Sequence, residues 1–125
     1  MSTYLINHLR IPGDIPNEEA VSYLEQVEDT AKNHGGKWLA QGEARAVEGT
    51  WPGAVVLMEF PDMAHAETWY NPPEYQKILP LRVNNAISDL VLVDGVTPDF
   101  TAAGYAGQIR NAIAAASASD GRGRS

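Results

Sequence analysis

Hydrophobic and polar positions alternate over several short stretches of the chain, a pattern typical of half-buried β-strands. In residues 3–11 the alternation places Tyr4, Ile6 and His8 on one side of a strand. A second stretch, residues 37–47, alternates more weakly and contains Gly42, so we expect an edge strand with a β-bulge at that glycine. Residues 54–60 are almost continuously apolar, which predicts a central strand. Residues 88–94 complete a predicted set of four strands.

Helical segments separate these strands. Asn17 is placed to cap the first helix, and apolar residues then recur on one helical face until two glycines end it: Ala20, Leu24, Val27 and Ala31. Asp62 is placed to cap the second, which covers roughly Met63–Asn71. Prolines at 72, 73 and 80 interrupt this segment, and Pro73 suits the first turn of another short helix.

The predicted order is β-α-β-β-α-β, the ferredoxin-like split βαβ unit of the α+β class, with an antiparallel sheet. Helices cover only one face of such a sheet. The other face would carry apolar side chains from three strands, and an exposed patch of that size normally marks an interface. We therefore expect a two-fold symmetric homodimer in which two sheets meet face to face.

The charge and composition narrow the possible partners. The chain has 125 residues, a formal net charge of −7 and only nine Lys and Arg residues, which argues against nucleic acid and against an anionic membrane. It contains no cysteine, so thiolate chemistry and disulfides are excluded. No apolar run is long enough to span a bilayer and no signal-like segment stands at the start, so we expect a cytoplasmic protein.

The composition changes after Gly95. Residues 97–118 are rich in alanine, and their larger apolar residues are about four positions apart, which favours a short helix: Tyr105, Ile109 and Ile113. The polar residues 117–125 are expected to be disordered. We therefore divide the chain into a domain of residues 1–96 and an extension of residues 97–125.

Several short runs carry a resemblance to a known family: Gly35-Gly36, Glu59-Phe60-Pro61, Trp69-Tyr70-Asn71, Pro73-Glu74-Tyr75 and Arg82. In these runs the sequence resembles the DUF1330 family over roughly Tyr4–Gly95. The resemblance implies a dimeric α+β barrel. The family has no generally assigned reaction, so the resemblance implies a fold more than a function. The sequence departs from the family at Pro72, where serine is typical, so a role for that serine does not transfer.

The first candidate for chemistry is Glu59, which ends an apolar strand. Burial there would raise its pKa toward neutrality and suit it to general base catalysis, with Arg82 as its natural partner. The alternative is a structural role, either a Glu59–Arg82 ion pair or pairing of Glu59 with the backbone of the following helix. His8 is a second candidate base, because the expected pairing of the first and last strands brings Asp89 near it; the alternative is a packed histidine.

The candidate ligand-binding residues are mostly aromatic or amide-bearing: Asn7, Trp69, Tyr70, Asn71 and Tyr75. Their hydroxyl and amide groups would hold a carbonyl or phenolate oxygen, whereas the alternative is packing and helix termination. Asn7, Trp69 and His65 are also similar in type to residues that related barrels use in cofactor-free oxygenation or haem breakdown. No two histidines have metal-ligand spacing and no phosphate-binding glycine motif is present, so no metal or cofactor is expected.

These observations favour a homodimer that binds a small molecule in an apolar pocket between sheet and helices. As an enzyme it would carry out cofactor-independent cyclisation, isomerisation or oxygenation of an enolisable or aromatic carbonyl compound. The first alternative is a ligand-binding or accessory dimer without turnover. The second is a structural dimer whose alanine-rich extension recruits a partner.

Overall fold

The computed structural model describes residues 1–13 and 15–123, with side chains through Ala118. The chain divides into two compact units, Met1–Gly95 and Val96–Ser125. In the first unit the elements follow the order β1 (Thr3–Arg10), α1 (Glu18–Lys32), β2 (Lys37–Glu43), β3 (Ala54–Phe60), α2 (Met63–Tyr70), α3 (Pro73–Gln76), α4 (Leu79–Val83) and β4 (Ile87–Asp94). This is the predicted split βαβ arrangement, and the fold is α+β and ferredoxin-like.

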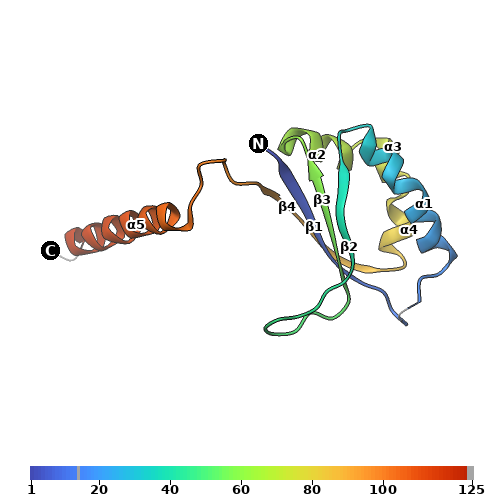
Figure 1. The fold of residues 1–125 in the computed structure, drawn as a ribbon, viewed down its shortest axis with the longest axis horizontal. Helices are drawn as coiled ribbons and strands as arrows, with labels where there is room; N and C mark the ends of the chain where they lie inside the picture. The colour runs from blue at the N-terminus through green and yellow to red at the C-terminus, as the bar shows by residue number, and fades with distance from the viewer. Residues whose placement is uncertain (14, 124–125) are drawn as a thin grey trace. The chain divides into compact units, whose positions relative to one another are not determined.

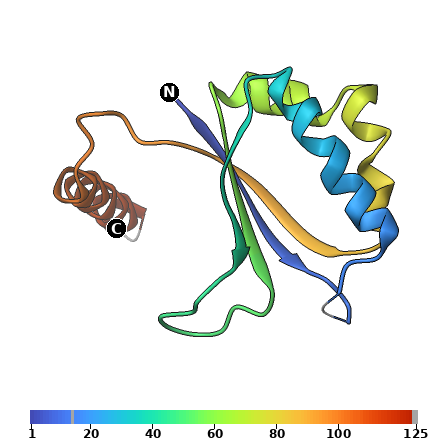
Figure 2. The same cartoon turned by 45° about the vertical axis from the view of Figure 1, so that its right-hand side comes forward.

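The four strands form one antiparallel sheet in the order β2-β3-β1-β4. The two strands with the strongest apolar patterns, β1 and β3, are central, and β2 lies at an edge as its weak alternation predicted. In the first unit the helices pack on one face of this sheet (Figures 1 and 2). The core lies between these two layers and contains mainly large apolar side chains: Leu5, Val27, Met58, Phe60, Trp69, Tyr75 and Ile78.

The helix starts are those that the sequence indicates. The side chain of Asn17 accepts a hydrogen bond from the backbone N–H of Ala20 at 3.0 Å, and Asp62 accepts one from His65 at 2.8 Å. Each cap satisfies a backbone donor that has no partner within its helix. Glycine is required at position 36, just after α1, because an added Cβ would lie 2.6 Å from the ring of buried Phe60.

The irregularity in β2 does not lie at Gly42, as predicted, but between Trp38 and Ala40. Trp38 pairs with Met58 and Ala40 with Leu57, which are consecutive residues of β3 and therefore face opposite sides of the sheet. Since a bulge shifts the alternation by one residue, Trp38 faces the helices and Ala40 does not. The strand also ends at Glu43, four residues before the predicted end.

The second unit contains α5 (Ala102–Gly123). It is longer than the short helix expected from the alanine spacing, and it includes most of the segment expected to be disordered. Residues 124–125, also expected to be disordered, lie outside the described residues. Larger apolar side chains of α5 are exposed at near-helical spacing: Tyr105, Ile109 and Ile113. The assignment of residues 97–125 as an alanine-rich extension to the domain stays a prediction.

Candidate functional site

A cavity of about 290 Å³ lies between the helix-facing side of the sheet and α1. Its floor consists of apolar side chains from the central strands, including Leu5, Val56 and Met58. Helix α1 contributes Ala20 and Tyr23, and the wall is mainly apolar throughout. A mainly apolar cavity with few polar groups is the common form of a small-molecule site.

Two of the buried polar side chains face this cavity. Arg82 is 8% exposed and Asn7 is 6% exposed, and both line the cavity. The Oδ1 atom of Asn7 is buried and has no hydrogen-bond partner among the described residues. Unpartnered buried polar atoms are rare because they lose their hydration without replacement, so Asn7 Oδ1 marks a place where a ligand can bind.

Two tyrosine hydroxyls connect Arg82 to the cavity wall. The hydroxyl oxygens of Tyr23 and Tyr75 lie 2.8 Å apart, and Arg82 Nε donates to the Tyr75 hydroxyl at 3.4 Å. Burial raises the pKa of Tyr23 well above its usual range, and Tyr75 raises it further. Tyr23 is therefore a neutral hydrogen-bond donor at any physiological pH.

We expect the wild-type protein to lose stability relative to Tyr23→Phe as pH rises above about 10, the ordinary tyrosine pKa. Unfolded Tyr23 loses its proton above that pH, whereas the raised pKa of the folded state keeps it bound. The unfolded state then binds fewer protons, so the free energy of unfolding falls with pH, by roughly 1 kcal/mol between pH 8 and pH 11. Urea unfolding at both pH values will measure this difference. Equal losses in the two proteins would show that Tyr23 ionises normally.

Trp69 forms the aromatic wall at one end of the cavity. Its ring centroid lies 4.3 Å from that of Tyr75 and 5.3 Å from that of Phe60. Its indole N–H donates to Thr30 Oγ1 at 3.0 Å. The only polar atom of the side chain is thus satisfied, which fixes the ring orientation beside the cavity.

Glu59 lies on the opposite face of the sheet from the cavity. It pairs with Lys37 at 3.0 Å, and the hydrogen bond from Lys37 lowers its pKa. The expected Glu59–Arg82 ion pair and the expected raised pKa of Glu59 are both wrong. The reason is strand alternation: Phe60 is fully buried against the helices, so Glu59 points the other way.

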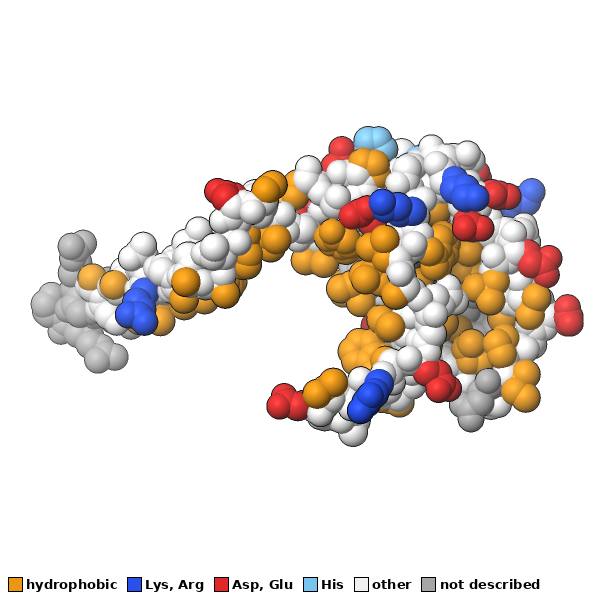
Figure 3. All heavy atoms as spheres, in the orientation of Figure 1, with side chains coloured by type: hydrophobic (Ala, Val, Ile, Leu, Met, Phe, Trp, Pro, Cys, Tyr) orange, Lys and Arg blue, Asp and Glu red, His pale blue; other side chains and the backbone are white. Residues whose placement is uncertain are grey.

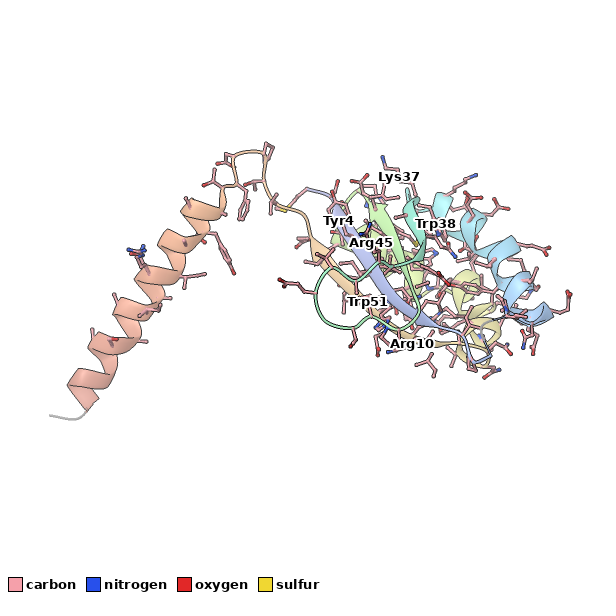
Figure 4. All side chains as sticks on the ribbon, turned by 60° about the horizontal axis from the view of Figure 1, so that its bottom comes forward. Tyr4, Arg10, Lys37, Trp38, Arg45 and Trp51 are labelled. Atoms are coloured by element: carbon pink, nitrogen blue, oxygen red, sulfur yellow. The ribbon has the colours of Figure 1, made fainter. Side chains whose placement is uncertain are left out.

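His8 also lies on this opposite face. The predicted register is confirmed, since His8 pairs with Asp89 across β1 and β4. However, Asp89 binds Arg10, while His8 Nε2 lies 2.6 Å from the Pro52 carbonyl oxygen. The ring of His8 stacks on Trp51 with centroids 4.1 Å apart. Trp51 belongs to the loop of residues 44–53, which passes over β1 (Figure 4).

The other predicted ligand-binding residues divide between the cavity and its surroundings. Asn7 and Trp69 line the cavity. Tyr75 lies beneath it and forms a hydrogen bond with the hydroxyl of Tyr23, which does line the cavity. Tyr70 packs on Trp69 and lines a neighbouring hollow beside β4. Asn71 is exposed at the end of α2, where its backbone N–H bonds to Glu67. The structure thus places Asn71 at the end of a helix, which was the alternative role predicted for it.

Sequence reasoning missed most of the cavity lining, and three of the missed residues carry aromatic or charged side chains: Tyr23, Trp38 and Glu43. Tyr23 lies four residues before buried Val27 and therefore belongs to the α1 stripe, a signal that was available. Trp38 faces the cavity because of the bulge, which the sequence did not locate. Glu43 is an exposed carboxylate at the end of β2, on the cavity rim.

Two further kinds of feature, a metal-binding cluster and a membrane span, are not found in the part of the chain that the structure describes. Among the described side chains, those of residues 1–13 and 15–118, no three His, Asp or Glu groups are close enough together to hold a metal ion. None of the described helices has the length and apolar character needed to cross a membrane.

The comparisons with known proteins agree on the fold. The model of a family described as "Domain of unknown function (DUF1330)" matches residues 2–96. No curated protein matches the sequence. A protein of unknown function from Rhodopseudomonas palustris, RPA0582, is 21% identical with a TM-score of 0.60, covering 78% of this chain and 84% of its own.

Two further structures share the fold at lower identity. A dimeric ferredoxin-like protein of unknown function from Jannaschia sp. CCS1 is 16% identical with a TM-score of 0.62, covering 76% of this chain and all of its own. SnoaB, a cofactor-independent oxygenase from Streptomyces nogalater, is 11% identical with a TM-score of 0.54, covering 80% of this chain and 97% of its own. Most of the similar structures have no assigned function.

Proposed function

The chain belongs to the DUF1330 family, and from this premise we propose that it is a homodimer that binds a carbonyl compound in each subunit's cavity. The observation that carries the proposal is the apolar cavity of about 290 Å³ into which the buried Arg82 and Asn7 point. Apolar walls with a few placed polar groups bind an aromatic or aliphatic body and orient one functional group.

We propose further that the bound compound undergoes cofactor-independent proton transfer. Arg82 and Tyr23 would stabilise the carbonyl oxygen as it becomes an enolate. Glu43 is the one carboxylate among the described lining residues, so it would accept the proton from the adjacent carbon. The electrons of that C–H bond then form the enolate, the common intermediate of cyclases, isomerases and oxygenases. This assignment replaces the expected bases His8 and Glu59 with Glu43.

The similarity to SnoaB supports this type of chemistry, because that protein is a cofactor-independent oxygenase on the same fold. The alternative is a binding or accessory module that holds the ligand without turnover. The exposed position of Glu43 favours this alternative, since a base at the rim is less shielded from water than one inside the cavity.

A test is hydrogen–deuterium exchange of 1-tetralone, a small aromatic ketone with an enolisable carbon. We expect the bound ketone to quench the tryptophan fluorescence of the protein, because Trp38 and Trp69 line the cavity. The protein should also accelerate deuterium uptake, measured by NMR, and Glu43→Gln should abolish the acceleration while retaining binding. Glu48→Gln, an exposed carboxylate outside the cavity, is the matched control. Binding without exchange would favour the accessory module, and no binding would contradict the proposal.

The proposed homodimer is supported by the sheet face that the first unit leaves uncovered. Its apolar side chains come from β1, β3 and β4: Ile6, Val55, Leu57, Val91 and Val93. Val91 is 55% exposed and Val93 is 46% exposed. Figure 3 shows hydrophobic side chains gathered over these strands, and Figure 4 shows Tyr4 and Arg10 toward opposite ends of β1. The relative from Jannaschia is dimeric, which supports a second copy as the partner of this face.

A further inference from the structure

Arg82 is a buried cation without an anionic partner. Its guanidinium group lines the cavity, yet its Nε–H bond to Tyr75 is its only hydrogen bond within the described part of the chain, and it forms no ion pair there. A buried charge is costly unless it is paired. The terminal amino groups of Arg82 are therefore the donors most in need of an acceptor from the cavity.

The tyrosine pair directs a second donor toward the same region. Tyr75 is 1% exposed and accepts from Arg82, so its own hydrogen is available for the Tyr23 oxygen at 2.8 Å. In this arrangement Tyr23, which lines the cavity, has its hydroxyl hydrogen free for a ligand. Because hydrogen bonds in a chain polarise one another, the positive charge of Arg82 makes Tyr23 a stronger donor.

Asn7 provides the complementary feature. Its buried Oδ1 has no partner among the described residues and accepts an N–H or O–H group. Glu43 on the rim places negative charge at the opening, which disfavours a second anionic group on the ligand.

From this arrangement we infer that the ligand is a monoanion, a carboxylate or a stable enolate on an apolar body, whose charged oxygen binds Arg82 and Tyr23. This inference rests on the proposed small-molecule function and specifies its ligand class. A hydroxyl or amino group on the same ligand would bind Asn7 Oδ1 and fix its orientation. Such a site binds an anionic ligand more tightly than a neutral ketone of the same shape.

The test is calorimetric titration with 2-naphthoate and with 2-acetylnaphthalene, which has the same shape but carries a methyl group in place of the charged oxygen. We expect 2-naphthoate to bind about 10- to 100-fold more tightly, the usual range for a charge-assisted hydrogen bond. Arg82→Met should remove most of this preference and Tyr23→Phe about 10-fold of the naphthoate affinity, with a smaller loss of ketone affinity in both because the neutral oxygen accepts weaker hydrogen bonds from the same donors.

The control variants are Arg110→Met and Tyr105→Phe, the same substitutions at exposed positions of α5. Both should bind 2-naphthoate like the wild type. Equal affinity for the two probes would overturn the monoanion inference while leaving the pocket function intact, whereas binding of neither probe would overturn both. If Arg82→Met fails to fold, as judged by circular dichroism, Tyr23→Phe decides the result: an unchanged naphthoate affinity overturns the inference.

Discussion

Replacing Trp69 with alanine is expected to lower the free energy of unfolding by about 3–5 kcal/mol. The indole is 2% exposed and contacts three aromatic rings, those of Phe60, Tyr70 and Tyr75. The substitution removes these contacts and joins the space that the ring occupied to the existing cavity. It also leaves the Thr30 hydroxyl without its donor. Urea unfolding followed by circular dichroism will measure the loss.

The matched control is Trp51→Ala, which removes the same side chain from an exposed position. Trp51 is 38% exposed and stacks on one ring, that of His8, so we expect a loss of about 1 kcal/mol or less. Trp69→Phe should lie between the two, because it keeps most of the ring contacts but not the hydrogen bond. A loss at Trp69→Ala no larger than at Trp51→Ala would show that the aromatic wall does not support the fold.

The fold could be predicted because its signals are local and repeated. Alternation in residues 3–11 and the apolar run in residues 54–60 each span a whole strand, so an error at one position does not change the assignment. The caps at Asn17 and Asp62 depend on one side chain and a backbone N–H three residues later. Such short-range geometry follows directly from sequence.

The site was harder to predict because it depends on which side of each element a residue faces. Glu59 was assigned to the cavity on its position at a strand end, whereas alternation with Phe60 places it on the other face. The alternation was visible in the sequence, but the prediction gave more weight to a possible Glu–Arg ion pair. The β2 bulge is different, since nothing in residues 37–43 indicates that the shift falls after Trp38 and not at Gly42.

The burial of Arg82 is the basis of its proposed role in ligand binding. Its position in α4, a helix of five residues packed against α1, places a charge among apolar side chains with only a tyrosine hydroxyl to bind. Exposed charges of this acidic chain contribute little to a specific site because water screens them. Arg82 is the one cation among the described lining residues, and unlike the rim carboxylate of Glu43 it is buried.

Replacing Val91 with lysine is expected to convert the proposed dimer to a monomer. Val91 is 55% exposed in the single subunit, so lysine should change subunit stability by no more than about 0.5 kcal/mol. In a face-to-face dimer, each copy would instead bury an unpaired ammonium group. Because the change occurs twice, we expect the dimer to weaken by about 4 kcal/mol or more, roughly 1,000-fold.

Light scattering across a dilution series measures this change as a fall in mass from twice 13.5 kDa to 13.5 kDa. Ile15→Lys is the control, since Ile15 is 81% exposed and lies outside the uncovered sheet face. A wild-type mass of 13.5 kDa at every concentration would contradict the dimer itself. If Val91→Lys remained dimeric with the wild-type affinity, the two copies would have to meet through a surface other than the one formed by β1, β3 and β4.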